Sequence, residues 1–591
     1  MEPPTQLVLQ QQQLLDSLSV HTIHNLQPPP SPVRLGEHIE TFTKDILRED
    51  VAILLTKPTI KSPAARNTLP FADYFVSSSH NTYLLSNQVL GKASALSYTH
   101  VLSQGARCVE IDVWPSSKGP IVTHGHTFSQ SIPFADVCAA IGASVYPDTW
   151  PVLVSLECHV YGEERQEELV RIMREAWGEK FVDGKQDDVE DKLTPEMVMG
   201  RILVMVEYYP FPHIPGSNHT EPLRPSSSSP SSSSSDSGHG ITSLWPHKRS
   251  QVPRHLRISP VLAAVGFYLR SMKPMKNWFS QLFTDPPNIL INISESSLLS
   301  LLTNSKTILN ILVTHAQTHI RRIYPKGLRL TSSNLRPYIF WGSGSHVVAL
   351  NWQSYDLGMQ VNEGMFVGTP GWVVKPKWMR EPITGDKYQD GRKTRIKGEV
   401  VGVCSTPPPS DRQRTPDSKP YNAYVKAQLL LPSPTAVPPS PLNILVAQTA
   451  SELEYRSEPQ NVKPISGDLD FAYPVDKADS SLAEEWDNLW WRNKHEERAL
   501  SKAVFEWEIF EKWEELTFLR LSVCKKEFGK DEELAIFCAR LTDIRAAIVD
   551  DVISRGPNGK ASGWRAVRLL DLNGKDCGAI ALVRFTFDVF D

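Results

Sequence analysis

The chain has 591 residues, enough for about two or three domains with a large hydrophobic core. Its formal net charge of −4 excludes a strong overall basic field, so we expect no nucleic-acid partner. Seven scattered cysteines favour free thiols in a reducing compartment, and no apolar run approaches the ~20 residues of a membrane span. We therefore expect a cytoplasmic protein whose contact with a membrane is peripheral.

The N-terminal part is expected to lie outside the main core. Residues 1–34 contain a glutamine run and three consecutive prolines, a composition typical of disorder. Residues 35–65 place Ile39, Phe42 and Ile46 at helical spacing. This spacing predicts a helical segment of one or two helices that pack on the next domain.

Two regions with the same pattern follow, separated by a linker. Residues 66–209 alternate short apolar strands with helical stretches, which predicts βα units and a parallel sheet. Residues 210–257 are rich in serine and proline and predict a flexible linker. The alternation resumes over residues 258–380. Together the two halves hold about 260 residues, close to the ~250 of a (β/α)8 barrel.

The last third of the chain changes character. Residues 395–591 contain strand-like segments without regular intervening helices, which predicts an antiparallel β-sandwich. Residues 404–420 and 432–483 are rich in proline and serine and are expected to be loops or partly disordered insertions.

Polar side chains gather at the ends of four predicted strands in the first half of the barrel. They are His80, Asn81, Glu110, Asp112, His124 and Glu157. Because strand side chains alternate with period two, Glu110 and Asp112 share one face. Carboxylate and amide oxygens suit calcium or magnesium better than zinc, and histidines supply acid–base chemistry near neutral pH. This combination favours metal-assisted phosphoryl transfer.

The motifs that contain these residues resemble a known family. S-S-S-H-N-T-Y-L (77–84), C-V-E-I-D-V-W (108–114), H-G-H-T (124–127) and S-L-E (155–157) are similar to the X half of eukaryotic phosphoinositide-specific phospholipase C. R-R-I-Y-P-K-G (321–327), V-A-L-N-W-Q (348–353) and W-V-V-K-P (372–376) are similar to its Y half. The resemblance implies a TIM-like barrel split into X and Y halves, followed by a C2-like sandwich. The segment before the barrel is too short for the family's pleckstrin domain and EF-hands.

The resemblance also implies an activity. The family converts phosphatidylinositol phosphates, phosphatidylinositol 4,5-bisphosphate among them, to diacylglycerol and inositol phosphates in intracellular signalling. Its cofactor would be Ca²⁺, bound by Asn81, Glu110, Asp112 and Glu157. Glu110 or Glu157 would accept the proton of the inositol 2-hydroxyl. His80 would stabilise the charged phosphorane, and His124 would protonate the leaving diacylglycerol oxygen.

The Y half is expected to bind the headgroup. Arg322 matches a contact to a ring phosphate and Tyr324 a contact to the inositol ring, with Asn292 and Ser294 where the family has a phosphate-binding serine. The neighbouring Arg321 is expected to be a solvated charge.

The chain departs from the family at β-strand positions 205 and 207. Met205 and Glu207 stand where the family has lysines that contact ring phosphates. A carboxylate there opposes a phosphate, so we expect a weaker preference for the 4,5-bisphosphate than the family shows.

Membrane contact is expected from an apolar rim around the pocket. Its members would be Val89, Leu90, Phe128, Leu299 and Leu328. In the C2-like domain, Lys525 and Lys526 occupy a loop where calcium-binding domains of this type place acidic ligands, which argues against a second metal site.

Two other interpretations fit parts of the sequence. A catalytically weak or inactive lipid-binding scaffold is favoured by Met205 and Glu207 and opposed by the retained histidines and carboxylates. A glycerophosphodiester phosphodiesterase would explain the barrel and its acidic pair, but not the Y-half motifs or the predicted sandwich.

Overall fold

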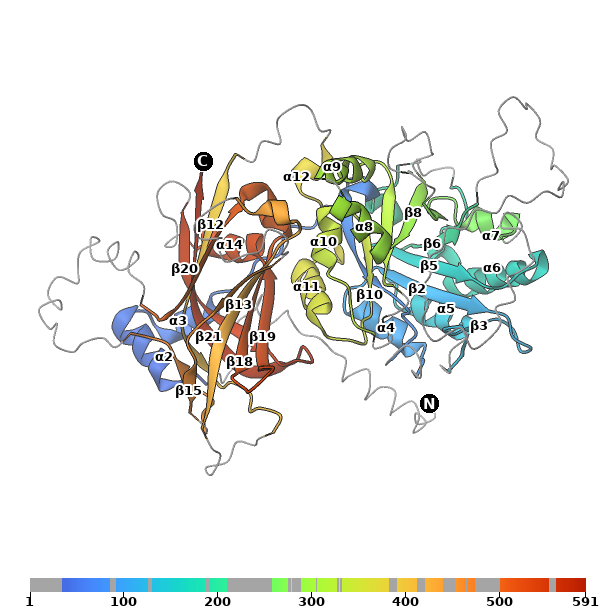
Figure 1. Ribbon diagram of the computed structural model, residues 1–591. Helices are drawn as coiled ribbons and strands as arrows, with labels where there is room; N and C mark the ends of the chain where they lie inside the picture. The colour runs from blue at the N-terminus through green and yellow to red at the C-terminus, as the bar shows by residue number, and fades with distance from the viewer. Residues whose placement is uncertain are drawn as a thin grey trace, which may run out of the picture.

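The structure is a computed structural model with two bodies, a barrel and a β-sandwich, that pack side by side (Figure 1). It describes residues 34–85, 92–125, 130–186, 192–209, 258–274, 278, 288–304, 306–326, 329, 332–381, 391–411, 420–438, 452–463, 465–473, 500–551 and 560–591. Residues 1–33 and 210–257 fall outside these ranges, as do 412–419, 439–451, 464 and 474–483 of the two predicted insertions, so the predictions of disorder there stay predictions.

Eight parallel strands form a closed barrel. Each strand pairs with the next, and the first pairs with both the second and the last, which closes the ring. The strands are β1 (Tyr74–Ser79), β2 (Cys108–Trp114), β5 (Val152–Cys158), β6 (Ile202–Glu207), β7 (Arg270–Met272), β8 (Ile289–Ser294), β9 (Ile320–Tyr324) and β10 (Val347–Leu350). Four come from each half of the predicted split barrel, so the predicted TIM-like fold is confirmed.

Helices cover the outside of the barrel (Figure 1). They are α4 (Leu96–Ser103), α5 (Phe134–Ala143), α6 (Glu163–Trp177), α7 (Pro260–Val265), α8 (Glu295–Asn304), α9 (Lys306–His315), α10 (Pro337–Gly342), α11 (Leu357–Phe366) and α12 (Lys377–Arg380). Short antiparallel strands flank the ring: β3 (Ile121–Val122) pairs with β2 and with β4 (Ile132–Pro133), and β11 (Trp372–Val374) pairs with β1.

The two faces of each barrel strand differ in a way that positions the site. On β2, Val109, Ile111 and Val113 point outward and pack under the helices. Cys108 on the opposite face joins an apolar layer inside the barrel with Val76, Leu153, Leu203, Leu290 and Val347. The inner face therefore begins apolar, and its polar residues come later on each strand, at the carboxyl end where the active sites of such barrels lie.

The second body is a 10-stranded antiparallel sandwich, as predicted. Its strands are β12 (Lys393–Cys404), β13 (Tyr421–Leu430), β14 (Glu452–Arg456), β15 (Gln460–Val462), β16 (Leu469–Asp470), β17 (Ala503–Phe510), β18 (Phe518–Lys525), β19 (Glu532–Arg540), β20 (Ala561–Leu570) and β21 (Asp576–Phe590). β14, β15 and β16 lie in residues 432–483, which were expected to be loop. That expectation is wrong there, because Leu453 and Val462 are apolar positions buried in the core and the strands extend the sheet.

The N-terminal helices pack on the sandwich. α2 (Glu37–Thr41), the π-helical turn Phe42–Ile46 and α3 (Val51–Thr56) bury Leu35, Ile39 and Phe42 against Val401, Cys404, Ile580 and Leu582. Arg34 adds an ion pair to Asp468 at 2.8 Å. The prediction that these helices cover the next domain in the chain is therefore wrong, because their apolar stripe matches the outer face of a sheet that forms more than 300 residues later.

The barrel and the sandwich are held in close contact. Arg520 on β18 donates to the Gln360 Oε1 of α11 at 2.8 Å and pairs with Glu533 at 2.7 Å. A Cβ on Gly364 would lie 3.1 Å from the Cys538 carbonyl of β19, so the absence of a side chain lets α11 approach that strand.

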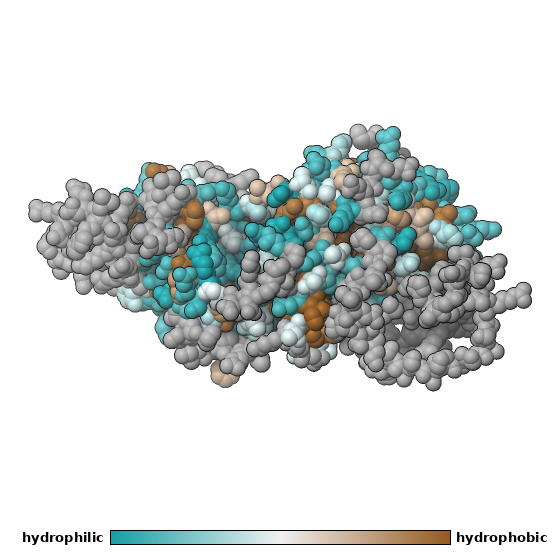
Figure 2. All heavy atoms as spheres, turned by 90° about the horizontal axis from the view of Figure 1, so that it is seen from above, coloured by the Kyte–Doolittle hydropathy of each residue, from teal (hydrophilic) through white to brown (hydrophobic). Residues whose placement is uncertain are grey.

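Among the described residues no helix has the length and apolarity needed to cross a bilayer. On the face shown in Figure 2 the described surface is mostly hydrophilic, with apolar side chains in small separate patches.

The sandwich contains a buried ion pair whose loss should destabilise it. Glu399 on β12 pairs with Arg584 on β21, and both side chains are almost completely buried. Arg584→Met leaves the Glu399 carboxylate without its partner, which should cost about 3–5 kcal/mol of sandwich stability. Calorimetry should show a lower melting temperature for this variant and recovery in the double variant Glu399→Met/Arg584→Met. A single variant that melts with the wild type would contradict the prediction.

Candidate active site

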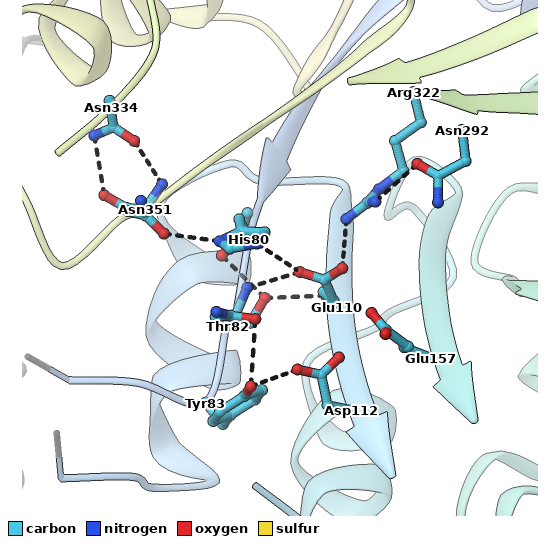
Figure 3. Close-up of polar contacts among 12 residues, drawn as sticks. His80, Thr82, Tyr83, Glu110, Asp112, Glu157, Asn292, Arg322, Asn334 and Asn351 are labelled. Carbon is cyan, nitrogen blue, oxygen red and sulfur yellow. Dashed lines mark hydrogen bonds and ion pairs between the residues drawn. The ribbon is translucent and has the colours of Figure 1, made fainter. Parts of the chain in front are cut away.

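The neighbouring strands β2 and β5 bring three carboxylates together at their carboxyl ends. The register pairs Asp112 with Glu157 and Glu110 with Ser155, so all three acidic side chains lie on the inner face of adjacent strands. One oxygen from each of Glu110, Asp112 and Glu157 lies within 4.8 Å of the others. Figure 3 shows the three carboxylates around one point at the end of the strands. The predicted cluster of acidic ligands is thus brought together.

The turn after β1 wraps around this cluster. Asn81 adopts a left-handed conformation with φ of 45°, which asparagine tolerates better than most residues. In this conformation the Asn81 N–H donates to Glu110 Oε2 at 2.8 Å. The Tyr83 hydroxyl then donates to Asp112 Oδ2 at 2.6 Å and lies 3.3 Å from Asn81 Oδ1. Tyr83 was missed by the sequence analysis, although it lies in the same motif.

The cluster fits a divalent cation. Asp112 Oδ1 is buried and has no hydrogen-bond partner among the described residues. Burial, followed by the negative charges of Glu157 and Glu110, raises the pKa of Asp112 well above its ordinary value. Oxygen ligands at this spacing suit Ca²⁺ or Mg²⁺, and a bound cation would offset the charge that burial disfavours. Asn81, Glu110, Asp112 and Glu157 are the residues that could hold it.

Glu157 is supported by a residue that the sequence analysis also missed. The Nε2 of His159 lies 3.3 Å from Glu157 Oε1, and this hydrogen bond lowers the pKa of Glu157. The His159 ring stacks on Trp114 with 3.9 Å between ring centroids. The spacing E-x-H could have suggested the contact, because residues two apart on a strand share a face.

His124 follows β3 in a turn that packs on the same tryptophan. A Cβ on Gly125 would fall 1.9 Å from Trp114 Cζ2, so only glycine allows this approach. The turn therefore holds Gly125 against the ring that stacks on His159, and His124, the residue before it, is half-buried.

Arg322 links the second half of the barrel to the cluster. Its guanidinium is almost fully buried and donates to Glu110 Oε1 at 2.7 Å and to Asn292 Oδ1 at 3.2 Å. The register aligns Asn292 with Arg322 and Ser294 with Tyr324 on neighbouring strands. The Ser294 hydroxyl accepts a hydrogen bond from the Ser297 N–H at 3.3 Å and so serves the first turn of α8. The structure brings Asn292 and Arg322 into contact at the site, whereas the Ser294 hydroxyl bonds to Ser297 on α8.

The expectation that Arg321 is solvated is wrong. Arg321 points outward from β9, but helices cover that face and leave the side chain fully buried. Its guanidinium donates to the Leu312 carbonyl at 2.6 Å and to the Ser343 carbonyl at 3.3 Å.

The two departures from the lysine pattern lie on the inner face of β6. Met205 is buried in the apolar layer of the barrel and aligns with Ser155. Glu207, two residues later on the same face, is half-buried and accepts a hydrogen bond from the Tyr209 hydroxyl at 2.8 Å. Glu207 therefore adds a carboxylate on β6, the strand next to β5, to the acidic side of the barrel mouth.

Four of the predicted rim residues, Val89, Leu90, Phe128 and Leu328, lie outside the described ranges. Leu299 on α8 is half-buried and packs against the hydrophobic core.

Comparison with known proteins agrees with this geometry. Residues 67–208 match the family model described as phosphatidylinositol-specific phospholipase C, X domain, and residues 262–378 match the Y domain. The chain is 33% identical over 325 residues to 1-phosphatidylinositol 4,5-bisphosphate phosphodiesterase delta-3 of Mus musculus, covering 53% of this chain and 39% of the relative. It is 32% identical over 349 residues to the zeta-1 enzyme of Homo sapiens, covering 58% of this chain and 55% of the relative.

The chain thus spans about half the length of these curated relatives, or less. Among solved structures, the crystal structure of L. pealei PLC21 superposes with a TM-score of 0.64 at 20% identity, covering 94% of this chain and 62% of the other, which supports the fold. The matching X and Y domains, joined in one closed barrel with its acidic mouth, show that the barrel of this chain is that of a phosphoinositide-specific phospholipase C.

Proposed function

We propose that the chain is a calcium-dependent phospholipase C that cleaves phosphatidylinositol phosphates, the 4,5-bisphosphate among them, into diacylglycerol and inositol phosphates. The observation that carries the proposal is the cluster of Glu110, Asp112 and Glu157 at the barrel mouth, with His80 and Arg322 against it. The names of the relatives, which act on phosphatidylinositol 4,5-bisphosphate, support the substrate class.

The reaction would begin with attack of the inositol 2-hydroxyl on the 1-phosphate. Both oxygens of Glu110 are engaged, by Arg322 and by the Asn81 N–H. Glu157 has half of its side chain exposed and a lowered pKa, so it is ionised and reachable. Of the two carboxylates considered as proton acceptor, the geometry therefore favours Glu157.

The remaining groups would act on the phosphate and the leaving oxygen. His80 Nε2 faces the cluster, 3.8 Å from Glu110 Oε2, and could donate to the charged phosphorane. His124 would protonate the diacylglycerol oxygen as it leaves. When bound by Asn81, Glu110, Asp112 and Glu157, calcium would lower the pKa of the 2-hydroxyl and offset charge on the phosphate.

Arg322 and Asn292 would bind the headgroup from the second half of the barrel, with Tyr324 and Ser294 at the same strand ends. Arg322 presents a planar fork suited to phosphate oxygens. Glu207 on the opposite side would repel a ring phosphate. The ring phosphates of the bisphosphate would therefore add less binding free energy than they do in enzymes that have lysines at these positions.

The sandwich would contact the membrane without its own calcium. The ammonium group of Lys525 lies 2.8 Å from Asp411 and 2.7 Å from Glu527, so a lysine already neutralises the acidic loops. Phe528 beside them is fully exposed, and Leu572 on the neighbouring loop is partly exposed. Apolar tips flanked by Lys526 and Lys530 fit shallow insertion into an anionic surface. The protein would thus be cytoplasmic and peripherally bound.

A lipid-binding scaffold with weak or no activity is the second candidate. The position of Glu207 inside the mouth favours it, because a like charge there weakens substrate binding. The buried acidic cluster opposes it, since a protein without catalysis gains nothing from that cost in stability.

His124→Ala should remove the general acid and lower turnover by roughly 10²–10⁴-fold with little change in vesicle binding. The release of water-soluble inositol phosphate from phosphatidylinositol vesicles in the presence of calcium measures this turnover. His100→Ala on α4 is the matched histidine control and should retain full activity. Normal turnover in His124→Ala would contradict the assigned role.

Calcium binding should weaken as the pH falls. Burial raises the pKa of Asp112 well above its ordinary value, so a proton competes with the cation, and calcium binding should release protons at pH values above the ordinary range of an aspartate. Isothermal titration calorimetry in buffers of different ionisation enthalpy measures both the calcium affinity and the number of protons released.

Asp112→Asn should weaken the calcium affinity at least tenfold, about 1.4 kcal/mol. Asp411→Asn in the sandwich should leave it unchanged, because Lys525 already occupies that cluster. Affinity that is independent of pH, or that is lost in Asp411→Asn, would place the calcium elsewhere.

Glu207→Lys should raise the turnover of phosphatidylinositol 4,5-bisphosphate relative to phosphatidylinositol by roughly tenfold or more, since removing a like charge at ~4 Å is worth a few kcal/mol. Matched vesicles of phosphatidylinositol, its 4-phosphate and its 4,5-bisphosphate give the ranking. Glu207→Gln separates loss of repulsion from gain of a cation. A wild-type protein that already strongly prefers the bisphosphate would contradict the repulsion of a ring phosphate by Glu207.

A further inference from the structure

His80 contacts an asparagine from the other half of the barrel. His80 follows the end of β1, Asn351 follows the end of β10, and the His80 N–H donates to the Leu350 carbonyl at 2.7 Å. The two side chains therefore leave adjacent parallel strands at the same level. The Nδ1 of His80 lies 2.9 Å from Asn351 Oδ1 (Figure 3).

This contact selects one form of the imidazole ring. The Asn351 Nδ2 faces the Ser333 carbonyl at 3.4 Å, and a carbonyl can only accept a hydrogen bond. The amide oxygen is thereby left to face His80, so the hydrogen in that contact belongs to His80 Nδ1. In the neutral ring the lone pair then lies on Nε2, the nitrogen 3.8 Å from Glu110 Oε2.

Asn351 is itself fixed by a second asparagine. The Asn351 N–H donates to Asn334 Oδ1 at 2.6 Å, and Asn334 Nδ2 donates back to the Asn351 carbonyl at 3.1 Å. Asn334 Nδ2 also lies 3.1 Å from Asp356 Oδ1. Asn351 has no exposed surface and Asn334 is 9% exposed. Both main-chain groups of Asn351 are therefore held within the protein.

We infer that Asn351, held by Asn334, is a positioning residue for His80. It keeps the proton on Nδ1 and directs Nε2 toward the reacting phosphate. The amide oxygen accepts from Nδ1 in the neutral ring and in the imidazolium alike, so the ring keeps one orientation, and when it is protonated its Nε2–H faces the phosphorane. This inference rests on the proposed phospholipase function.

The test compares three variants of the full chain. Asn351→Leu removes the acceptor at similar size, and Asn351→Asp keeps an acceptor but adds charge. Asn362→Leu is the control: Asn362 is also buried, lies on α11 and is 3.5 Å from Ser77 Oγ on β1. Turnover and KM are measured against pH on phosphatidylinositol–phosphatidylcholine vesicles with calcium. ¹⁵N NMR of labelled histidine reports the tautomer, with the His80 signals identified by their loss in His80→Gln.

Asn351→Leu should lower kcat roughly 10–100-fold, the effect typical of residues that orient a functional histidine, with KM nearly unchanged. Its His80 nitrogens should lose the pure Nδ1–H signature of the wild type. Asn351→Asp should restore that signature and recover part of kcat, because its carboxylate also accepts a hydrogen bond from Nδ1. Asn362→Leu should match the wild type in kcat and in the His80 spectrum.

Two results would overturn the inference: a folded Asn351→Leu with kcat within twofold of the wild type, or a wild-type His80 that carries its neutral proton on Nε2. A wild-type protein that cleaves no lipid but shows the Nδ1–H signature and its loss in Asn351→Leu would overturn the proposed function and leave the positioning of the ring supported.

Discussion

The structure depends on burying negative charge at the mouth of the barrel. Three carboxylate side chains meet within 4.8 Å at the ends of β2 and β5, and two of them, Glu110 and Asp112, are buried where water cannot screen their repulsion well. Arg322 offsets part of this charge through Glu110, and the Asn81 N–H and the Tyr83 hydroxyl supply hydrogen bonds. Burial and the charges of Glu157 and Glu110 still raise the pKa of Asp112 well above its ordinary value. A bound divalent cation would offset the remaining negative charge and complete the site.

Neither half of the split barrel is functional alone in this account. The first half supplies the carboxylates and His80, and the second supplies Arg322 and Asn351, which contact Glu110 and His80 directly. The barrel closes on both sides, through β1 with β10 and β6 with β7, so the two halves fold as one body. The inserted linker between β6 and β7 is therefore compatible with a precise site, because the strands on either side of it remain paired.

The barrel and its acidic cluster could be predicted from the sequence, because the acidic residues lie at the ends of short strands in which apolar residues recur regularly. Period-two alternation was enough to place Glu110 and Asp112 together. Contacts between distant segments could not be predicted: Asn351 gives no local signal that it faces His80. Arg321 resembles a surface charge until the helices over β9 are known. The N-terminal helices carry an apolar stripe, but a stripe does not say which sheet it covers.

The most direct test of the account is ³¹P NMR of the soluble products formed from phosphatidylinositol vesicles in the presence of calcium. If the barrel mouth catalyses attack by the inositol 2-hydroxyl, the first phosphorus signal in solution will be that of the inositol 1,2-cyclic phosphate, followed by the open monophosphate. Phosphatidylinositol whose 2-hydroxyl is methylated will not be cleaved. Cleavage of the methylated lipid, or formation of phosphatidic acid and free inositol, would contradict the account.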